Sequence, residues 1–258
     1  MTAAIQDSAT MLRRNLRRSL RYPVSAAVAI GVPLVFLLLF VFVLGDTLGA
    51  GLGGGGRGAY LDYVTPGILV LAIAGAAQGV SIAVAMDMSE GIIARFRTMA
   101  IARVSVLTGH VASAVIQTQI AIVVVLAVAL ALGFDPTASA LDWLAAFALL
   151  IGVTFAIVWL AVALGLVSKN VETASNLPMP LLILPFLGSA FVPTDSMPTA
   201  MRWFAEYQPF TPIMETLRGL LMGTPIGSSG PLAIGWSVVI GLGSYVWAKR
   251  LYNRDPTP

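Results

Sequence analysis

The sequence predicts an all-α polytopic membrane protein with six transmembrane helices. Of the 258 residues, 58% are hydrophobic and only 10% are charged, whereas ordinary soluble domains carry about 25% charged residues. The mean hydropathy is +0.89, and several apolar runs reach the roughly 20 residues with which a helix crosses a bilayer. A water-soluble core cannot bury this much apolar surface, so the bilayer is predicted to be the solvent of the fold.

Residues 1–23 are predicted to form an N-terminal amphipathic helix at the cytoplasmic membrane surface. Apolar side chains alternate there with five arginines, a pattern typical of helices that lie in the headgroup plane of an anionic leaflet. Nucleic-acid binding is the rival interpretation, but no nucleic-acid partner is expected because an apolar run follows directly. The arginines are Arg13, Arg14, Arg17, Arg18 and Arg21.

Residues 24–258 are predicted to form one transmembrane domain. Pro33 is expected to kink its first span, and Pro178, Pro180 and Pro185 are expected to break or bend its fifth. A cleaved signal peptide is the alternative for the first span, but the apolar run is longer than a typical signal core. The six predicted spans cover residues 24–44, 66–86, 107–132, 141–167, 174–192 and 231–248.

Two segments outside the spans are rich in glycine or proline. Residues 49–58 form a glycine-rich stretch that lacks the Lys and Ser/Thr of a phosphate-binding loop, so a flexible linker is predicted. Residues 193–230 contain apolar patches that are too short and too charged to cross a bilayer. They are predicted to form short extracellular re-entrant helices in the outer leaflet.

The distribution of basic residues predicts the orientation. With six spans both termini lie on one side, and twelve of the 15 basic residues fall on that side. The other side receives only Arg57, Arg202 and Arg218. Because cytoplasmic loops carry the excess of Lys and Arg, both termini are predicted to be cytoplasmic, in a multi-pass protein of the plasma membrane.

Several kinds of chemistry are disfavoured by composition. The chain has no cysteine and a single histidine, His110, so disulfides, thiolate metal sites and histidine clusters are not expected. His110 is predicted to be an ordinary interfacial residue. No charged side chain falls at the centre of a predicted span, which argues against proton- or sodium-coupled transport. No set of acids, histidines or nucleophiles shares one membrane depth, so the chain is not expected to be an enzyme.

A polar stretch lies between the second and third spans, on the predicted cytoplasmic side. Asp87 and Glu90 have the spacing of a capping box, which predicts that a helix begins there. Ile92, Phe96 and Met99 recur at helical spacing as one apolar stripe. A short amphipathic helix that docks another protein is one interpretation, and a basic loop that merely anchors two spans is the other.

Two motifs resemble those of ABC-2 type export permeases, most closely the daunorubicin-resistance branch from actinobacteria. Glu-Gly-Ile-Ile-Ala-Arg-Phe-Arg at residues 90–97, continued by Ala-Arg-Val-Ser-Val-Leu at residues 102–107, is similar to the cytoplasmic loop of that family. Residues 208–219, from Gln-Pro-Phe-Thr-Pro to Glu-Thr-Leu-Arg-Gly, are similar to the signature before its last span. One departure is Met99-Ala100, where the family pattern has Leu-Pro.

The resemblance implies a permease that dimerises, with a second copy or a related permease, and sits on cytoplasmic ABC ATPase subunits. No cofactor is then expected in this chain, because ATP and magnesium belong to the ATPase. The coupling helix that contacts the ATPase would contain Glu90, Gly91, Arg95, Phe96 and Arg97. The extracellular re-entrant signature would contain Pro209, Thr211, Pro212, Glu215 and Arg218. The last two are spaced to pair on one helical face.

Polar side chains within the spans are candidates for contact with a lipophilic small-molecule substrate. Polar residues inside a membrane also join neighbouring helices by hydrogen bonds, which is the alternative role for each of them. They are Gln78, Ser81, Gln117, Gln119, Asn176 and Ser189.

Together these features predict the permease subunit of an ATP-driven ABC exporter that moves an amphipathic drug, antibiotic or lipid-like molecule out of the cell. An ABC-2 permease that exports a glycan or glycolipid is the nearest alternative. A non-transporting membrane scaffold or immunity protein is the alternative of another class.

Overall fold

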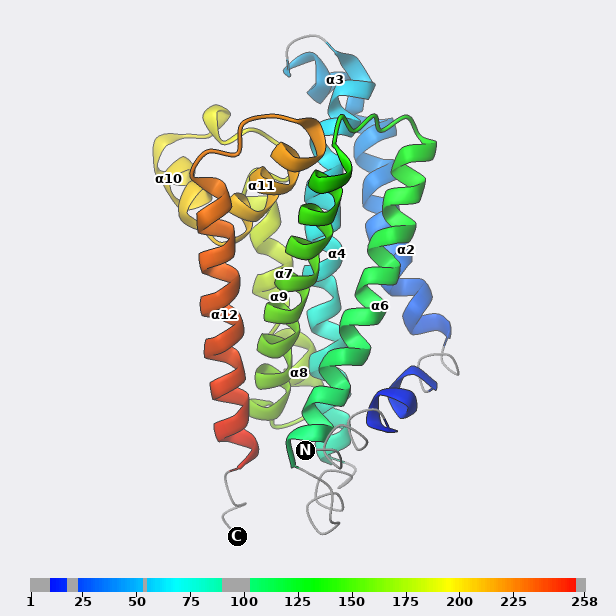
Figure 1. Ribbon diagram of the computed structural model, residues 1–258, viewed down its shortest axis with the longest axis vertical. Helices are drawn as coiled ribbons and strands as arrows, with labels where there is room; N and C mark the ends of the chain where they lie inside the picture. Colours follow the sequence, from blue (N-terminus) through cyan, green and yellow to red (C-terminus); the bar gives the residue numbers. More distant parts are fainter. Residues whose placement is uncertain (1–9, 18–22, 53–54, 90–102, 254–258) are drawn as a thin grey trace.

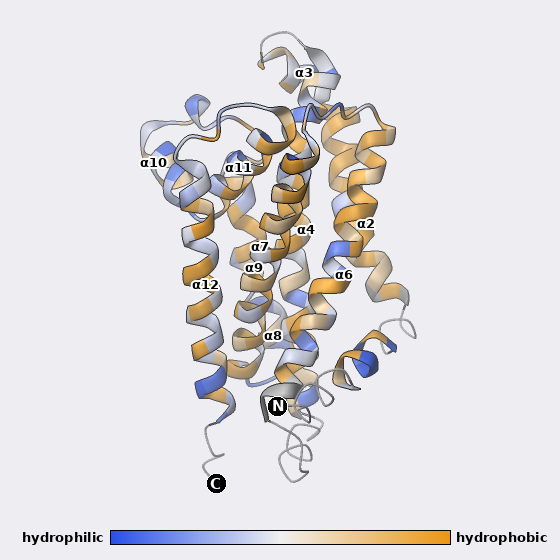
Figure 2. Cartoon of the chain, in the orientation of Figure 1, coloured by the Kyte–Doolittle hydropathy of each residue, from blue (hydrophilic) through white to orange (hydrophobic). Residues whose placement is uncertain are grey.

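The computed structural model describes residues 10–17, 23–52, 55–89 and 103–253. Every regular element in these ranges is a helix, which confirms the all-α class. Five helices are long and apolar enough to cross a membrane, and Figure 1 shows them side by side as an elongated bundle. Figure 2 shows hydrophobic residues along their length and hydrophilic residues gathered toward the two ends. The five are Ala26–Ala50, Gly56–Ser89, Leu107–Ala131, Ala140–Val167 and Ser229–Tyr252.

The two ends of the bundle differ in what they contain. We call the end at which helix 10–17 lies the lower end, as drawn in Figure 1; α4 and α12 finish there and α6 begins there. The opposite, upper end carries α3, α10 and α11. The long helices are α2 (Pro23–Leu39), α4 (Gly56–Ser89), α6 (Arg103–Ala131), α7 (Ala140–Val167) and α12 (Ser229–Tyr252).

The first span is longer than predicted. Pro33 lies within α2 without ending it, and α2 continues through a π-helical turn, Phe40–Leu44, into α3 (Gly45–Ala50). Many side chains of α2 are exposed, as expected of a helix on the outside of a membrane bundle, where lipid is the neighbour.

The central helix of the fold is α4, which packs against α2, α3, α6, α7, α8 and α11. The helix extends beyond the predicted start of this span at Pro66, because α4 begins at Gly56 and Pro66 lies buried within it. The hydroxyl of Thr65 donates to the carbonyl of Leu61 at 2.7 Å. Threonine hydroxyls and neighbouring helices satisfy backbone groups near a proline, which is why prolines are tolerated inside membrane helices.

The glycine-rich stretch at residues 49–58 is not the plain linker that its composition predicts, because both of its ends are helical. α3 and α4 meet in a tight corner, where the Arg57 guanidinium lies 2.8 Å from the Asp46 carboxylate. A Cβ on Gly49 would clash with the backbone carbonyl of Gly56. The two helices approach this closely because glycine has no side chain.

Gly49→Ala is therefore expected to lower the stability of the protein by about 1–3 kcal/mol, the typical cost of overpacking. Gly58→Ala is the matched control, because nothing lies within 4 Å of a Cβ at that position and alanine favours helix over glycine. Apparent melting temperatures in detergent compare the two variants. Equal melting temperatures would show that the α3–α4 corner is not as tight as the structure has it.

The fifth predicted span is broken, as its prolines predict. It consists of α8 (Val171–Asn176), α9 (Met179–Ile183) and the 3-10 helix η2 (Leu184–Leu187). Pro178 is the N-cap of α9, and Pro185 lies inside η2. α8 and α9 pack against α4, and Figure 1 shows α8 nearer the lower end than α9.

Short helices lie at the upper end, where residues 193–230 are predicted to form them. In α10 (Thr199–Tyr207) the Arg202 guanidinium lies 2.7 Å from both Glu206 and Asp195. The hydrogen bond to Glu206 and the charge of Asp195 raise the pKa of Arg202. α11 (Phe210–Met222), in contrast, is mostly buried and packs against α4, α7 and α12 as part of the core.

Candidate functional site

Two polar clusters lie at opposite ends of α4. The first, which we call the upper clasp, joins α4, the segment after η2 and α11. Its members are Tyr63, Ser189, Gln208, Thr211, Glu215 and Arg218.

Arg218 is the centre of the upper clasp. Its guanidinium donates to the carbonyl oxygens of Tyr63 at 3.1 Å and Ser189 at 2.9 Å. It also lies 2.8 Å from the Glu215 carboxylate, so the spacing of three residues does produce the predicted ion pair. The guanidinium carbon is 3.9 Å from the centroid of the Tyr63 ring. One side chain thereby connects three segments that are far apart in the sequence.

A second set of hydrogen bonds holds the start of α11 to the same segment. The Thr211 hydroxyl accepts from the Gln208 amide at 2.9 Å and from the backbone N–H of Ser189 at 3.3 Å. Pro209 is the N-cap of α11, and Pro212 lies buried in its first turn. Of the predicted re-entrant signature, Thr211, Glu215 and Arg218 therefore make polar contacts, whereas the two prolines shape the start of the helix.

The second cluster, which we call the lower triad, consists of Arg14, Asp87 and His110. Asp87 is wrongly predicted to begin a helix, because it lies in the last turn of α4. Its fully buried side chain lies 3.0 Å from Nε2 of His110 and 3.5 Å from Nη1 of Arg14. His110 is only 8% exposed, and it contacts a buried carboxylate, a contact that the prediction of an ordinary interfacial residue did not include. A buried carboxylate needs such partners.

The lower triad fixes helix 10–17 to the bundle. Met11 is buried, and a Cβ on Gly109 of α6 would press against the Met11 side chain. Asp87 is two residues before the end of α4, and His110 is in the second turn of α6. The triad therefore holds together the N-terminal helix and the two helices that flank residues 90–102.

The predicted coupling residues lie outside the described residues. They are Glu90, Gly91, Arg95, Phe96 and Arg97. The structure describes only the helix ends on either side of them, Ser89 of α4 and Arg103 of α6, and both lie at the lower end (Figure 1).

Three of the predicted substrate-path residues donate hydrogen bonds to other described residues. Gln78 is exposed and donates to the Ser175 carbonyl of α8 at 3.0 Å, and Gln119 donates to the Thr154 hydroxyl of α7 at 3.0 Å. Gln117 instead donates to Ser113 of its own helix at 2.8 Å. The contacts of Gln78 and Gln119 are the helix-joining alternative for such residues, whereas the contact of Gln117 stays within one helix. Contact with cargo stays a prediction.

The other three path residues differ in exposure. Ser81 and Ser189 are buried, and their hydroxyl oxygens have no hydrogen-bond partner in the described part of the chain. Asn176 is exposed at the end of α8. Within the described ranges, no group of three or more histidines, aspartates and glutamates could hold a metal ion.

Sequence reasoning missed Tyr63, the aromatic partner in the upper clasp, and the contacts that bring Arg14, Asp87 and His110 together. Tyr63 is 155 residues from Arg218, and Asp87 is 23 residues from His110. A single sequence carries no signal for pairs at such separations, because neither the 3.6-residue period nor capping patterns relate them. Only the identity of His110, a lone histidine in an apolar chain, marked one member as unusual.

Comparison with known proteins agrees with the resemblance. Residues 7–222 match the sequence profile of the ABC-2 type transporter family, and that range contains both motifs and both clusters. A daunorubicin resistance ABC transporter permease protein of Streptomyces coeruleorubidus is 28% identical over 166 residues, which are 64% of this chain and 59% of that relative. The match thus spans less than two thirds of the relative. This multi-pass membrane protein belongs to the ABC-2 type transporter family.

Proposed function

We propose that the chain is the permease subunit of an ATP-driven exporter, which moves an amphipathic drug, antibiotic or lipid-like molecule out of the cell. The observation that carries this proposal is the family match over residues 7–222. The drug-resistance role in the name of the relative supports the substrate class. ATP hydrolysis takes place on a partner ATPase, which holds the ATP and magnesium.

In this proposal the lower end faces the cytoplasm and residues 90–102 contact the ATPase. Helix 10–17, the end of α4, the start of α6 and the end of α12 all lie at that end (Figure 1). The excess of basic residues assigned to the same side supports the orientation. Both termini are then cytoplasmic in the plasma membrane, and the upper end with α10 and α11 is extracellular.

The fifth crossing is made by α8, α9 and η2 together. Support comes from the two ends of the chain: helix 10–17 and the end of α12 share the lower end, which requires an even number of crossings. The five long helices of the described ranges give an odd number, so the short segments supply one more. A broken crossing of this kind is compatible with a membrane when protein or a cavity satisfies its backbone.

A conformational change at the lower end can be transmitted to the upper end through α4. Asp87 and Tyr63 lie 24 residues apart on this one helix, which corresponds to a rise of about 36 Å at 1.5 Å per residue. The lower triad holds one end of α4 and the upper clasp holds the other. A movement of α4 that follows ATP hydrolysis would therefore be transmitted to α11.

Reconstitution with the partner ATPase tests the proposed function. We expect the complex to transport a lipophilic cationic drug such as daunorubicin into inside-out vesicles when ATP is present, and the drug to stimulate ATP hydrolysis. Vesicles that contain this chain without the ATPase should show no ATP-dependent uptake. The proposal fails if no ATPase complex forms, as expected of a scaffold, or if the chain transports drug unaided.

Phe96→Ala and Glu90→Lys are each expected to uncouple hydrolysis from export. Loss of an interface anchor typically costs 2 kcal/mol or more of binding free energy, so drug transported per ATP hydrolysed should fall about 30-fold. Phe155→Ala is the matched control, because that phenylalanine is 48% exposed on α7. If both coupling variants insert into the membrane at the level of the unmodified protein and transport drug normally, residues 90–102 do not couple ATP hydrolysis to transport.

A further inference from the structure

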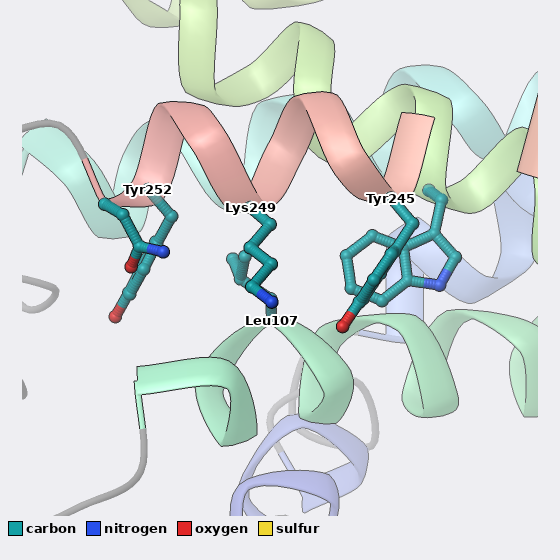
Figure 3. Close-up of a pocket in the computed structure, with 6 residues that line it drawn as sticks. Leu107, Tyr245, Lys249 and Tyr252 are labelled. Atoms are coloured by element: carbon teal, nitrogen blue, oxygen red, sulfur yellow. The ribbon is translucent and has the colours of Figure 1, made fainter. Parts of the chain in front are cut away.

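A narrow crevice opens at the lower end of the bundle, between the start of α6, the lower half of α7 and the last turns of α12. It is lined by Leu107, Trp159, Tyr245, Lys249, Tyr252 and Asn253. Figure 3 shows Lys249 between Tyr245 and Tyr252 on one side of α12, with its side chain directed toward Leu107 of α6. A wider groove continues from it along α12 and adds Val246 and Arg250 to the lining.

One residue that lines the crevice carries an unsatisfied hydrogen-bond donor. Trp159 is 2% exposed, and its indole Nε1 is buried without a partner in the described part of the chain. The ring stands edge-on to Tyr245, with centroids 5.0 Å apart and an interplanar angle of 89°. Buried indole N–H groups usually find an acceptor, and the described residues supply none to this one.

The outer part of the crevice is basic. Lys249 and Arg250 are both exposed, and among the described residues neither forms an ion pair. Of the described residues, no acidic one lines the crevice or the groove. The side chains of Lys249, Arg250 and Asn253 therefore lie together at the end of α12, next to two tyrosines. A membrane–water boundary is expected at this end of the helix.

An apolar surface continues from this basic site toward the middle of α12. Val239, Leu242 and Val246 are 63%, 63% and 43% exposed, and their spacing of three and four residues places them on one face of the helix. Arg250 and Asn253 continue the same face by one further turn. One side of α12 thus presents a basic head region followed by an apolar track.

We infer that this crevice and track bind one anionic phospholipid. The phosphate lies at Lys249, Arg250 and Asn253, an acyl chain follows Val246, Leu242 and Val239, and the polar oxygens of the lipid provide acceptors near Trp159. Basic pockets between transmembrane helices are known to take anionic headgroups. The inference needs the membrane setting of the chain but neither the ATPase nor cargo, so its test is independent of the proposed function.

Two rival roles for the crevice lead to different expected results. In the first, the lysine and arginine extend toward the interface merely to reach water, and no particular lipid is held. In the second, the crevice takes the exported cargo. Both are decided by measuring which molecule reaches Trp159.

The experiment uses the purified full-length chain in detergent, titrated with phosphatidylglycerol whose acyl chains carry bromine. Bromine quenches tryptophan fluorescence at short range, and the Trp159 contribution is the difference between the protein and Trp159→Phe. Phosphatidylcholine with the same brominated chains is the neutral comparison. Native mass spectrometry counts the phosphatidylglycerol retained, and sn-glycerol 3-phosphate tests whether the headgroup alone binds.

We expect phosphatidylglycerol to quench Trp159 at a tenfold or greater lower concentration than phosphatidylcholine, and sn-glycerol 3-phosphate not to compete. Each basic residue near the surface contributes roughly 1 kcal/mol, so Lys249→Gln combined with Arg250→Gln should weaken binding about 30-fold. The matched control is Lys169→Gln combined with Arg17→Gln, because both residues are exposed outside the crevice. The control should change binding less than twofold.

Three outcomes overturn the inference. Equal quenching by the two lipids would remove the anionic selectivity, and equal weakening by the crevice and control variants would reduce the effect to general surface charge. Displacement of brominated phosphatidylglycerol from Trp159 by a lipophilic drug, with drug bound in its place, would assign the crevice to cargo.

Discussion

Arg218→Met is expected to lower the stability of the protein by about 2–3 kcal/mol, because it removes the guanidinium that donates to the Tyr63 and Ser189 carbonyls and pairs with Glu215. The side chain is 12% exposed, so water cannot easily replace it. Methionine keeps the apolar stem of the arginine but leaves Glu215 without its partner and the Tyr63 and Ser189 carbonyls with fewer donors. For a chain of this length, the apparent melting temperature should fall by roughly 5–10 °C.

A surface arginine provides the control for this prediction. Arg202 pairs with two carboxylates, those of Asp195 and Glu206, but its side chain is 45% exposed. Exposed ion pairs contribute about 0–1 kcal/mol, so Arg202→Met should shift the melting temperature little. Arg218→Lys should lie between the two, because an ammonium group lacks the planar fork that serves both carbonyls and Glu215. Similar melting temperatures for Arg202→Met and Arg218→Met would show that the upper clasp adds no more than a surface pair.

Asp87→Asn is expected to release helix 10–17 from the lower end of the bundle. The substitution keeps the shape of the side chain but removes the negative charge that faces both Arg14 and His110. Removing one partner of a buried ionic contact commonly lowers stability by about 3 kcal/mol. The loss is smaller here because Arg14 is 32% exposed. The population of the released state should then rise tenfold or more, which corresponds to about 1.4 kcal/mol.

The absence of native cysteine makes this release measurable. A cysteine introduced at Met11, which is 6% exposed, is the only thiol in the chain, and its labelling rate by a water-soluble maleimide reports exposure of helix 10–17. We expect that rate to rise about tenfold with Asp87→Asn, as the shift in population requires. It should not change with Asp46→Asn, because Asp46 pairs with Arg57 at the upper end. An unchanged rate with Asp87→Asn would mean that apolar contacts alone hold the helix.

Both predictions concern contacts between distant segments, and these are the contacts that sequence patterns leave open. The apolar runs placed α6, α7 and α12 within a few residues of their observed bounds, because a membrane helix must satisfy its backbone internally and its length is set by the bilayer. The prolines correctly predicted a broken fifth segment. Pro66 misled the prediction for α4, since a proline ends a helix in water more reliably than inside a packed membrane bundle.

The polar stretch before the third span shows the same division between local and tertiary information. The spacing of Asp87 and Glu90 fits a capping box, which is a local pattern. In the fold, α4 continues through Asp87 to Ser89, and the carboxylate faces His110 and Arg14 instead. The Asp87 carboxylate thus contacts two side chains that are distant in the sequence, and it does not cap the N-terminus of a helix.

By itself the sequence determined that the protein is an all-helical membrane protein, where most of its long helices lie, and that it resembles a family whose profile it then matched. Those properties follow from hydrophobic length, helix period and local motifs, all of which are carried by neighbouring residues. Only the tertiary structure decided that α4 is the central helix, that Arg218 connects it to α11, and that Asp87 connects it to α6 and helix 10–17. Those contacts depend on how the helices pack in space, and packing brings together residues that no sequence period relates.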